Sequence, residues 1–388
     1  MGRGKTMSRV FIQVYCNYPH GEASSNYIQN LAKAILAAGY EVILATDINE
    51  DYEVSDIISS NKPITVIPVV PSRDEKESQL QKKKGFYDER IGILKEYGIT
   101  KDDRVIMLWL KNEFFLNQLF AFEKEVGFKS ICGVLELFAE EDYPTKDKFV
   151  QDAHIVREVY LQSDAILSIS EYIDQYYINR GKRVYRLPPM IDVAEYPMET
   201  KSMDKYRFII PSQKDSLRAM IMAFMGMEQD EIENIELHLC GTDKETLKKM
   251  FSEAEWRQLM KFSTVHGWLK YEKLIDLYQR MHFMVIARNT CQRTLANFPS
   301  KVPEVMNLGV IPIVSDVGDY TKYYLKDDYD SFFVNGDSVE EIRKSIRKAI
   351  SLNKEEYRLH SENARRTAKE RFDYHVWIPK VKQMLETV

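Results

Sequence analysis

One stretch in the last third of the chain limits the possible folds more than any other. Residues 281–287 form a short apolar run, which is typical of a buried strand, and residues 311–315 form a second such run. Between them, a polar loop rich in cations leads to Ser300, which can cap a helix with Pro303 in its first turn. Gly309 can end that helix directly before the second run. The pattern predicts a strand, a basic loop, a short helix and another strand, as in an α/β domain.

The same stretch carries residues that suit an anion. Free N–H groups and the helix dipole at the start of the predicted helix, residues 304–308, favour negative charge. Arg288, Arg293 and Lys301 add positive charges, and the carboxylate of Glu304 can accept hydrogen bonds from hydroxyls. Together these groups describe a site for a molecule with phosphates and a polyol. The alternative is an ordinary connecting loop.

This stretch resembles the retaining nucleotide-sugar glycosyltransferases of the GT-B fold, especially family 4. That family carries a loop of the form Glu-x-Phe-Gly-x4-Glu-Ala-x-Ala-x-Gly-x-Pro-x-x-x-Ser-x-x-Gly-Gly. The positions that match are Phe298, Glu304, Gly309, Ser315 and Gly318. Ala296 stands at the first Glu position and Pro299 at the Gly position. The similarity is closest to members with Phe-Pro-Thr/Ser-Lys, which often act in bacterial surface-polysaccharide assembly.

The resemblance covers nearly the whole chain and is stronger after residue 200. It implies an α/β protein of the GT-B class, with two Rossmann-like, doubly wound parallel-sheet domains that face each other across a cleft. The expected divisions are an acceptor-side domain at 1–192, a linker at 193–203, a nucleotide-sugar domain at 204–372, and a tail at about 373–388 that packs back on the first domain.

Composition narrows the class of protein. A length of 388 residues suits two or three domains, and the net charge of −5 argues against non-specific nucleic-acid binding. The four cysteines are far apart in the sequence and match no metal-site spacing, so we expect reduced, buried thiols. No run of about 18 apolar residues is present, and the first ten residues lack the apolar segment of a secretory signal. These features predict a cytoplasmic protein without a membrane-spanning helix.

The first domain opens with a predicted strand, helix and strand at 9–16, 24–38 and 41–45. Gly21 lies in the first loop, and the resemblance implies that this loop approaches the acceptor or a donor phosphate; a plain connection is the alternative. Further strands are expected at 64–70, 104–110, 130–135, 164–170 and 184–187, and helices at 78–97, 117–126, 148–162 and 171–180.

Two features of this domain suggest function. Glu136 follows the predicted strand at 130–135, at the carboxyl end where α/β sheets bind ligands. The family usually has a histidine or an acid near this position, so Glu136 is the candidate catalytic acid or base, with a structural carboxylate as the alternative. The helix at 78–97 contains Gln81-Lys-Lys-Lys and Phe86, which suit a solvated face or docking on an anionic membrane or a lipid-linked acceptor.

In the second domain the resemblance assigns roles to two loops. Ser212 and Lys214 would lie beside the pyrophosphate, with Arg218 one helical turn further on; a surface lysine is the alternative. Residues 264–268 resemble the nucleobase loop, which makes His266, Gly267 and Trp268 candidates for contacts with the base. For Trp268 a place in the core is the competing interpretation. Other strands are expected at 206–210, 235–240 and 331–334, and helices at 217–225, 270–280 and 339–352.

No Asp-x-Asp sequence follows a predicted strand, so we expect neither a metal site nor a cofactor. The charge of a leaving diphosphate would instead be met by cations already in place. The expected catalytic residues are Glu136, Lys214 and Lys301. The expected residues that bind the donor are Gly21, Ser212, Arg218, His266, Gly267, Trp268, Arg288, Arg293, Ser300 and Glu304.

The resulting hypothesis is a retaining glycosyltransferase. It would move a sugar from a nucleotide-diphosphate sugar to a glycan or a lipid-linked acceptor. The protein could also contact the inner face of the membrane peripherally. A catalytically impaired subunit is an alternative, since Ala296 replaces a family Glu. A sugar-nucleotide epimerase or hydrolase is another, although the Phe298–Gly309 pattern argues against it. A two-domain sugar-binding protein is the third.

Overall fold

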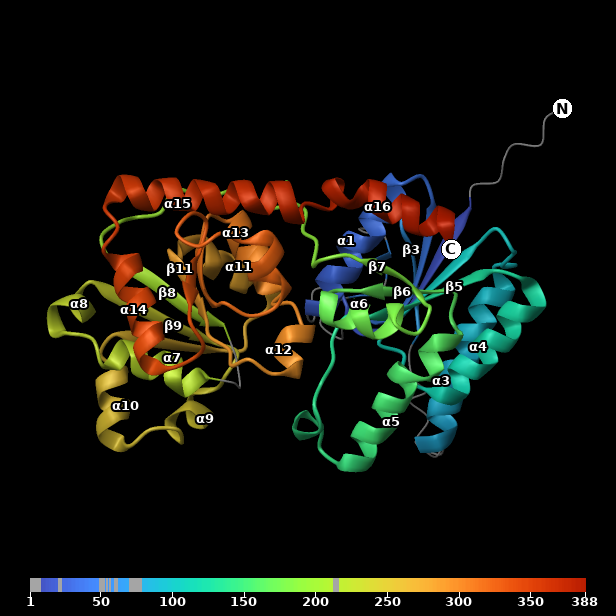
Figure 1. The fold of residues 1–388 in the computed structure, drawn as a ribbon, viewed down its shortest axis with the longest axis horizontal. Coiled ribbons are helices and arrows are strands. Elements are labelled where there is room, and N and C mark those ends of the chain that lie inside the picture. Colours follow the sequence, from blue (N-terminus) through green and yellow to red (C-terminus); the bar gives the residue numbers. More distant parts are fainter. Residues whose placement is uncertain are drawn as a thin grey trace. The chain divides into compact units, whose positions relative to one another are not determined.

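The structure is a computed structural model, and it divides the chain into two compact units (Figure 1). It describes residues 8–19, 23–48, 53, 55, 57–58, 62–69, 79–211 and 216–388, with only the backbone for residues 17, 79–84 and 86. One unit comprises the described residues up to Met190 together with Tyr374–Val388, and the other comprises Ile191–Asp373.

The first unit is built on a seven-stranded parallel sheet in the order β3-β2-β1-β4-β5-β6-β7. An interior strand of this sheet, β1, is buried on both faces, as shown by the consecutive buried residues from Val10 to Val14. The strands are β1 (Arg9–Tyr18), β2 (Glu41–Ile48), β3 (Thr65–Pro68), β4 (Arg104–Leu108), β5 (Lys129–Val134), β6 (Ala165–Ser168) and β7 (Arg183–Arg186). The helices are α1 (Ala23–Ala37), α3 (Gln79–Glu96), α4 (Glu113–Val126), α5 (Lys146–Arg157), α6 (Glu171–Ile178) and α16 (Tyr374–Thr387), with 3-10 turns at Glu140–Asp142 and Val159–Gln162.

The last helix, α16, belongs to the first unit although it ends the chain. It packs along α1, and its buried face includes Val381, Met384 and Leu385 (Figure 1). Its last turn is also tied to the sheet, because Arg104 Nε at the start of β4 donates to the carbonyl oxygen of Leu385 over 2.9 Å. The segment therefore closes one side of the first unit.

The second unit contains a six-stranded parallel sheet in the order β10-β9-β8-β11-β12-β13. Its core includes Phe208, Phe224 and Phe283, with the rings of Phe208 and Phe283 stacked at 4.9 Å. The strands are β8 (Tyr206–Pro211), β9 (Ile235–Cys240), β10 (Ser263–Gly267), β11 (Phe283–Ile286), β12 (Ile311–Ser315) and β13 (Phe332–Val334). The helices are α7 (Leu217–Met225), α8 (Gln229–Glu233), α9 (Lys244–Lys248), α10 (Glu253–Leu259), α11 (Tyr271–Arg280), α12 (Gln292–Ala296), α13 (Lys301–Asn307), α14 (Val339–Ile350) and α15 (Lys354–Thr367), with π-helical turns at Tyr320–Tyr324 and Ala368–Phe372.

Each sheet has a point at which the strand order reverses. In the first sheet the chain adds strands on one side of β1 and then continues from β4 on the other, and in the second sheet β8 and β11 have the same relation. Ligands of open α/β sheets bind at such switch points, outside the carboxyl ends of the strands. The topology therefore confirms the predicted α/β class and marks where functional residues should be found.

The sequence predictions differ from the structure mainly in short elements. Five-residue α12 lies in the stretch that we expected to be a loop, and β10 covers most of the stretch expected to be the nucleobase loop. The expected cap at Ser300 is wrong: its backbone is helical, with φ −55° and ψ −25°, and its side chain makes no capping hydrogen bond. A capping side chain needs an extended backbone at that position.

Candidate active site

The carboxyl ends of three strands of the second sheet meet at one serine. Ser315 ends β12, and its Oγ accepts a hydrogen bond from the backbone N–H of Arg288, the second residue after β11, over 2.8 Å. The same hydroxyl donates to the carbonyl oxygen of Gly336, just beyond β13. Ser315 therefore fixes the backbone from which the Arg288 side chain extends, beside the switch point of this sheet.

Arg288 and Lys301 are two half-buried cations at this edge of the sheet. Burial lowers the pKa of the Arg288 guanidinium, while Tyr320 acts in the opposite direction. Burial also lowers the pKa of Lys301, opposed by the charge of Glu304 and reinforced by that of Arg288. Within the described residues, neither side chain forms a hydrogen bond or an ion pair. A charge that is partly shielded from water and has no partner is less favourable than a paired one, so both cations would gain from an added anion.

Glu304 lies in the first turn of α13, close to Lys301 and to Tyr271 at the start of α11. Burial, followed by the charge of Glu304, raises the pKa of Tyr271 well above its ordinary value, so this phenol is a neutral hydrogen-bonding group. The ring of Tyr196 meets that of Tyr271 edge to face at 6.4 Å. A carboxylate, a lysine and a phenol therefore gather at the edge of the sheet where Arg288 lies.

Trp268 is 80% exposed directly after β10, which rules out the interpretation of its side chain as core. Gly267 before it has a left-handed backbone, with φ +65°, which glycine adopts without strain. The carbonyl oxygen of Gly267 accepts from Gly241 N over 2.7 Å, so the strand end is anchored while the indole is left accessible. An accessible aromatic ring at this edge can stack on a flat ligand.

His266 makes a different contact from its two neighbours. Its Nε2 lies 2.9 Å from Nδ1 of His238 on β9, and the two rings stack with an interplanar angle of 15°. Burial, with the neighbouring His266 as the next cause, lowers the pKa of His238 to about 4, so this ring is neutral at pH 7. The side chain of His266 thus pairs across the sheet, and a contact with a ligand would have to come from its backbone.

Arg218 has partners of its own among the described residues. Its Nε donates to the carbonyl oxygen of Met250 over 3.1 Å, and its Nη2 lies 3.3 Å from Oε1 of Glu255. Its predicted role on the diphosphate therefore competes with existing partners. Three predicted site residues, Gly21, Ser212 and Lys214, lie outside the residues that the structure describes.

Two residues of the sequence motif have packing roles. Phe298 contacts Tyr320, Tyr324 and Phe372 edge to face, with ring centroids 5.5–5.8 Å apart. Ala296, at the end of α12, is fully buried. Arg293 lies within α12, and Ser300 directly precedes α13. The motif thus combines residues that shape the loop with the charged residues that line the edge.

At the corresponding edge of the first sheet, Glu136 lies two residues beyond β5. The indole N–H of Trp109, directly after β4, donates to Oε1 of Glu136 over 3.1 Å. The sequence analysis did not include Trp109 among the candidates. Trp109 falls inside the strand predicted at 104–110, whereas β4 ends at Leu108 in the structure, which places Trp109 at the same edge as Glu136 because parallel strands end on one side of a sheet.

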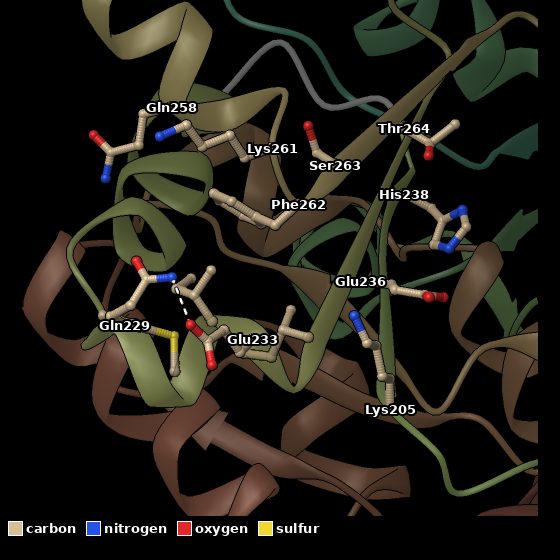
Figure 2. Close-up of a pocket in the computed structure, with 13 residues that line it drawn as sticks. Lys205, Gln229, Glu233, Glu236, His238, Gln258, Lys261, Phe262, Ser263 and Thr264 are labelled. Carbon is tan, nitrogen blue, oxygen red and sulfur yellow. Dashed lines mark hydrogen bonds between the residues drawn. The ribbon is translucent and has the colours of Figure 1, made fainter.

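A hollow of about 660 Å³ lies toward the amino ends of β8, β9 and β10 (Figure 2). Its lining includes Lys205 before β8, Glu236 and His238 on β9, and Lys261 before β10, and Gln229 donates to Glu233 at its rim over 3.0 Å. This is the opposite end of the strands from Arg288 and Glu304. The hollow is therefore separate from the predicted site.

Two further observations concern the described parts of the chain. No set of three or more histidine, cysteine, aspartate or glutamate side chains there is grouped so that it could hold a metal ion. None of the helices described is both long enough and apolar enough to cross a lipid bilayer. Metal independence stays a prediction.

The two parallel-sheet α/β units together have the GT-B fold, which the chain shares with solved glycosyltransferases. It is similar to sucrose-phosphate synthase from Thermosynechococcus elongatus, with a TM-score of 0.69, 15% identity and coverage of 98% of each chain. It is also similar to Alr3699/HepE from Anabaena in complex with UDP and glucose, with a TM-score of 0.69, 10% identity and coverage of 97% of this chain and 100% of that chain. WaaG, a glycosyltransferase involved in lipopolysaccharide biosynthesis, gives a TM-score of 0.66 at 14% identity, over 97% of this chain and 99% of that chain. Identities this low establish the fold alone.

The sequence adds a family match within the second unit. Residues 213–367 match the family model described as Glycosyl transferases group 1. The matched segment contains Arg288, Lys301 and Glu304, so the charged cluster lies inside it. No curated protein matches the chain.

Proposed function

We propose that this protein is a glycosyltransferase that takes a sugar from a nucleotide-diphosphate sugar bound at the carboxyl edge of the second sheet. The observation that carries the proposal is the pair of half-buried cations, Arg288 and Lys301, which have no hydrogen-bond or ion-pair partner among the described residues. A diphosphate would supply the missing negative charge. The family match over the same segment, and the glycosyltransferases that share the fold, support sugar transfer as the activity.

The chemistry follows from charge that develops on the leaving diphosphate. As the bond between the anomeric carbon and the phosphate oxygen breaks, negative charge grows on that oxygen. Arg288 and Lys301 are already in place, so they stabilise the charge without reorganisation, which lowers the barrier more than it strengthens ground-state binding. Lys214 would add a third cation by resemblance to the family. Retention at the anomeric carbon and independence of a metal ion are further parts of the proposal.

The remaining groups at the edge suit the nucleoside. Glu304 would accept hydrogen bonds from the ribose hydroxyls, and Trp268 would cover one face of the base. The Anabaena protein is described in complex with UDP and glucose, which makes a uridine nucleotide the first donor to test. The base and the sugar would be identified by a thermal-shift screen of nucleoside diphosphates and their sugars.

The acceptor would bind to the first unit, with Glu136 as the acid or base that handles the proton of its reacting hydroxyl. We propose a glycan or a lipid-linked saccharide as the acceptor class. We also propose a contact of α3 with the inner face of a membrane. The side chains of Gln81–Lys84 and Phe86, which suggest this contact in the sequence, lie outside the described residues.

The experiment that tests the function is donor turnover followed by mass spectrometry. The protein is incubated with the donor that the screen identifies, with and without an extract of saccharide acceptors, in EDTA and then in Mg²⁺. Release of the nucleoside diphosphate in EDTA, even slowly and to water, supports a metal-independent enzyme. Tight donor binding without any turnover would point to the catalytically impaired subunit, for which the buried Ala296 in place of a carboxylate is the specific observation.

A further inference from the structure

Trp109 has a backbone conformation that bulky residues rarely adopt. Its φ is +56°, in the left-handed region, where a side chain crowds its own backbone. The turn is closed by the N–H of Lys111, which donates to the carbonyl oxygen of Trp109 over 3.1 Å. Such strain persists only where the surroundings impose it, and it is concentrated at functional sites.

Trp109 lies beside a closely packed pair of strands in the first sheet. It follows β4 directly, beside β1 and therefore at the switch point of the first sheet, where ligands of such sheets bind. Leu108, the residue before it, pairs with Gly133 on β5. A Cβ atom at Gly133 would lie 2.1 Å from Cδ2 of Leu108, so a larger residue there would require the Leu108 side chain to move. The end of β4 therefore packs closely against β5 at the point where the chain turns.

Two contacts fix the indole ring itself. Its edge meets the ring of Tyr27 on α1, with centroids 6.4 Å apart and an interplanar angle of 87°. Its N–H donates to Oε1 of Glu136 over 3.1 Å. Lys111, two residues after Trp109, forms an ion pair with Asp152, with Nζ and Oδ2 3.8 Å apart. The indole N–H is a neutral donor, so this hydrogen bond directs the carboxylate of Glu136 without placing a charge beside it.

We propose that Trp109 is a positioning residue, which uses its strained turn and its indole N–H to hold the carboxylate of Glu136 toward the acceptor. The inference rests on the proposed function, because it assumes that Glu136 acts on the acceptor. A tryptophan that only filled space would need neither the left-handed backbone nor the hydrogen bond. The indole N–H favours the ionised carboxylate, which is the form that can accept the proton of the acceptor hydroxyl.

The first test removes the N–H and keeps a ring. Trp109→Phe should lower kcat about tenfold and move the acid limb of the kcat/KM profile upward by about one pH unit, since one pH unit corresponds to about 1.4 kcal/mol of lost preference for the ionised form. The KM for the donor should not change. Trp256→Phe, at a buried position on α10 of the other unit, is the matched control and should leave the pH profile unchanged.

The second test does not depend on turnover. In protein labelled with 5-fluorotryptophan, the ¹⁹F resonance that disappears in Trp109→Phe should shift as Glu136 titrates, and this shift should be absent in Glu136→Gln. A Trp109 resonance that ignores the ionisation of Glu136 would overturn the inference, even if no donor is ever turned over and the proposed function fails. If Glu136→Gln abolishes transfer but Trp109→Phe keeps the wild-type kcat and acid limb, the inference is wrong while the proposed function stands.

Discussion

The backbone N–H of Arg288 and the hydroxyl of Ser315 are joined by a hydrogen bond of 2.8 Å, which links the ends of β11 and β12. Arg288 is thereby held at the edge of the sheet by a group that has no charge of its own. Ser315→Ala should leave that N–H without its partner, at a cost of about 1–3 kcal/mol in the free energy of unfolding, and should weaken nucleotide binding. Chemical denaturation and calorimetric titration of the same variant measure the two effects.

Ser345→Ala is the matched control for this change. Ser345 also donates from a nearly buried hydroxyl, to the carbonyl oxygen of Phe333 over 2.9 Å, but from α14. It should lose stability without losing affinity for the nucleotide. An equal loss of affinity in both variants would mean that Ser315 acts only through general stability.

Glu304 should discriminate between ribose and deoxyribose. If its carboxylate accepts from the ribose hydroxyls, Glu304→Ala loses a charge-assisted hydrogen bond worth about 1.5–3 kcal/mol. The wild-type protein should therefore bind the ribonucleoside diphosphate more tightly than its 2′-deoxy analogue, and the variant should bind the two about equally. If a folded Glu304→Ala protein still prefers the ribonucleotide, Glu304 does not accept hydrogen bonds from the ribose hydroxyls.

Trp268 should contribute to base binding but not to stability. Stacking of a base on an aromatic side chain is worth about 1–3 kcal/mol, by alanine substitution in other systems. Trp268→Ala should weaken nucleotide binding by that amount, Trp268→Phe should weaken it less, and neither should shift the thermal midpoint, because the side chain is 80% exposed. Tyr323→Ala, at another exposed aromatic residue of this unit, serves as the control. Unchanged affinity in Trp268→Ala would mean that the exposed indole has another purpose.

Glu123 and Asp164 predict a dependence of stability on pH in the first unit. Burial, followed by hydrogen bonding to Asp164, raises the pKa of Glu123 to about 8, and its buried Oε1 faces no donor among the described residues. Ser130 Oγ donates to its other oxygen over 2.8 Å. These features describe a protonated carboxyl that donates to Asp164.

The sign follows from proton binding. Between the ordinary carboxyl pKa and about pH 8, the folded state holds a proton on Glu123 that the unfolded state has lost, so the free energy of unfolding should fall as pH rises through this range. The lowered pKa of Asp164 acts at lower pH, below its ordinary range. Thermal unfolding between pH 5.5 and 8.5 should show the fall in the wild type, a flatter profile in Glu123→Gln, and no flattening in the exposed control Glu125→Gln. A wild-type midpoint that rises toward pH 8 would contradict the protonated pair.

The bounds of a strand or helix could be predicted from the sequence where apolar residues repeat regularly along it. The apolar runs of β9 and β12 and the amphipathic helix α7 were predicted to the residue, because burial on a regular element leaves a periodic pattern. The same approach missed α12, which has five residues and is closed by a side chain: Thr294 Oγ1 accepts from Cys291 N over 2.9 Å. A helix of that length carries too few residues to show a period.

The candidate site also contains residues that the sequence predicts and contacts that it does not. Arg288, Lys301 and Glu304 could be proposed from charge and from the motif, since they lie in one short stretch. The contact of Trp109 with Glu136 joins residues 27 positions apart, and the pairing of His266 with His238 depends on the register of β9 and β10. Contacts of this kind follow from strand order and from side-chain direction, which the sequence pattern does not contain.

The central claim is that Arg288 and Lys301 bind the diphosphate of the donor. Its most direct test is calorimetric titration with the nucleoside diphosphate that the screen identifies and with the corresponding nucleoside, for the wild type, Arg288→Met, Lys301→Met and the surface control Lys248→Met. Each site variant should bind the diphosphate at least tenfold more weakly and the nucleoside as before. It should unfold at no lower a temperature, because it loses a half-buried charge that has no partner among the described residues. Lys301→Met should also lower kcat about a hundredfold or more. Diphosphate affinities within twofold of the wild type in both folded variants would contradict the account.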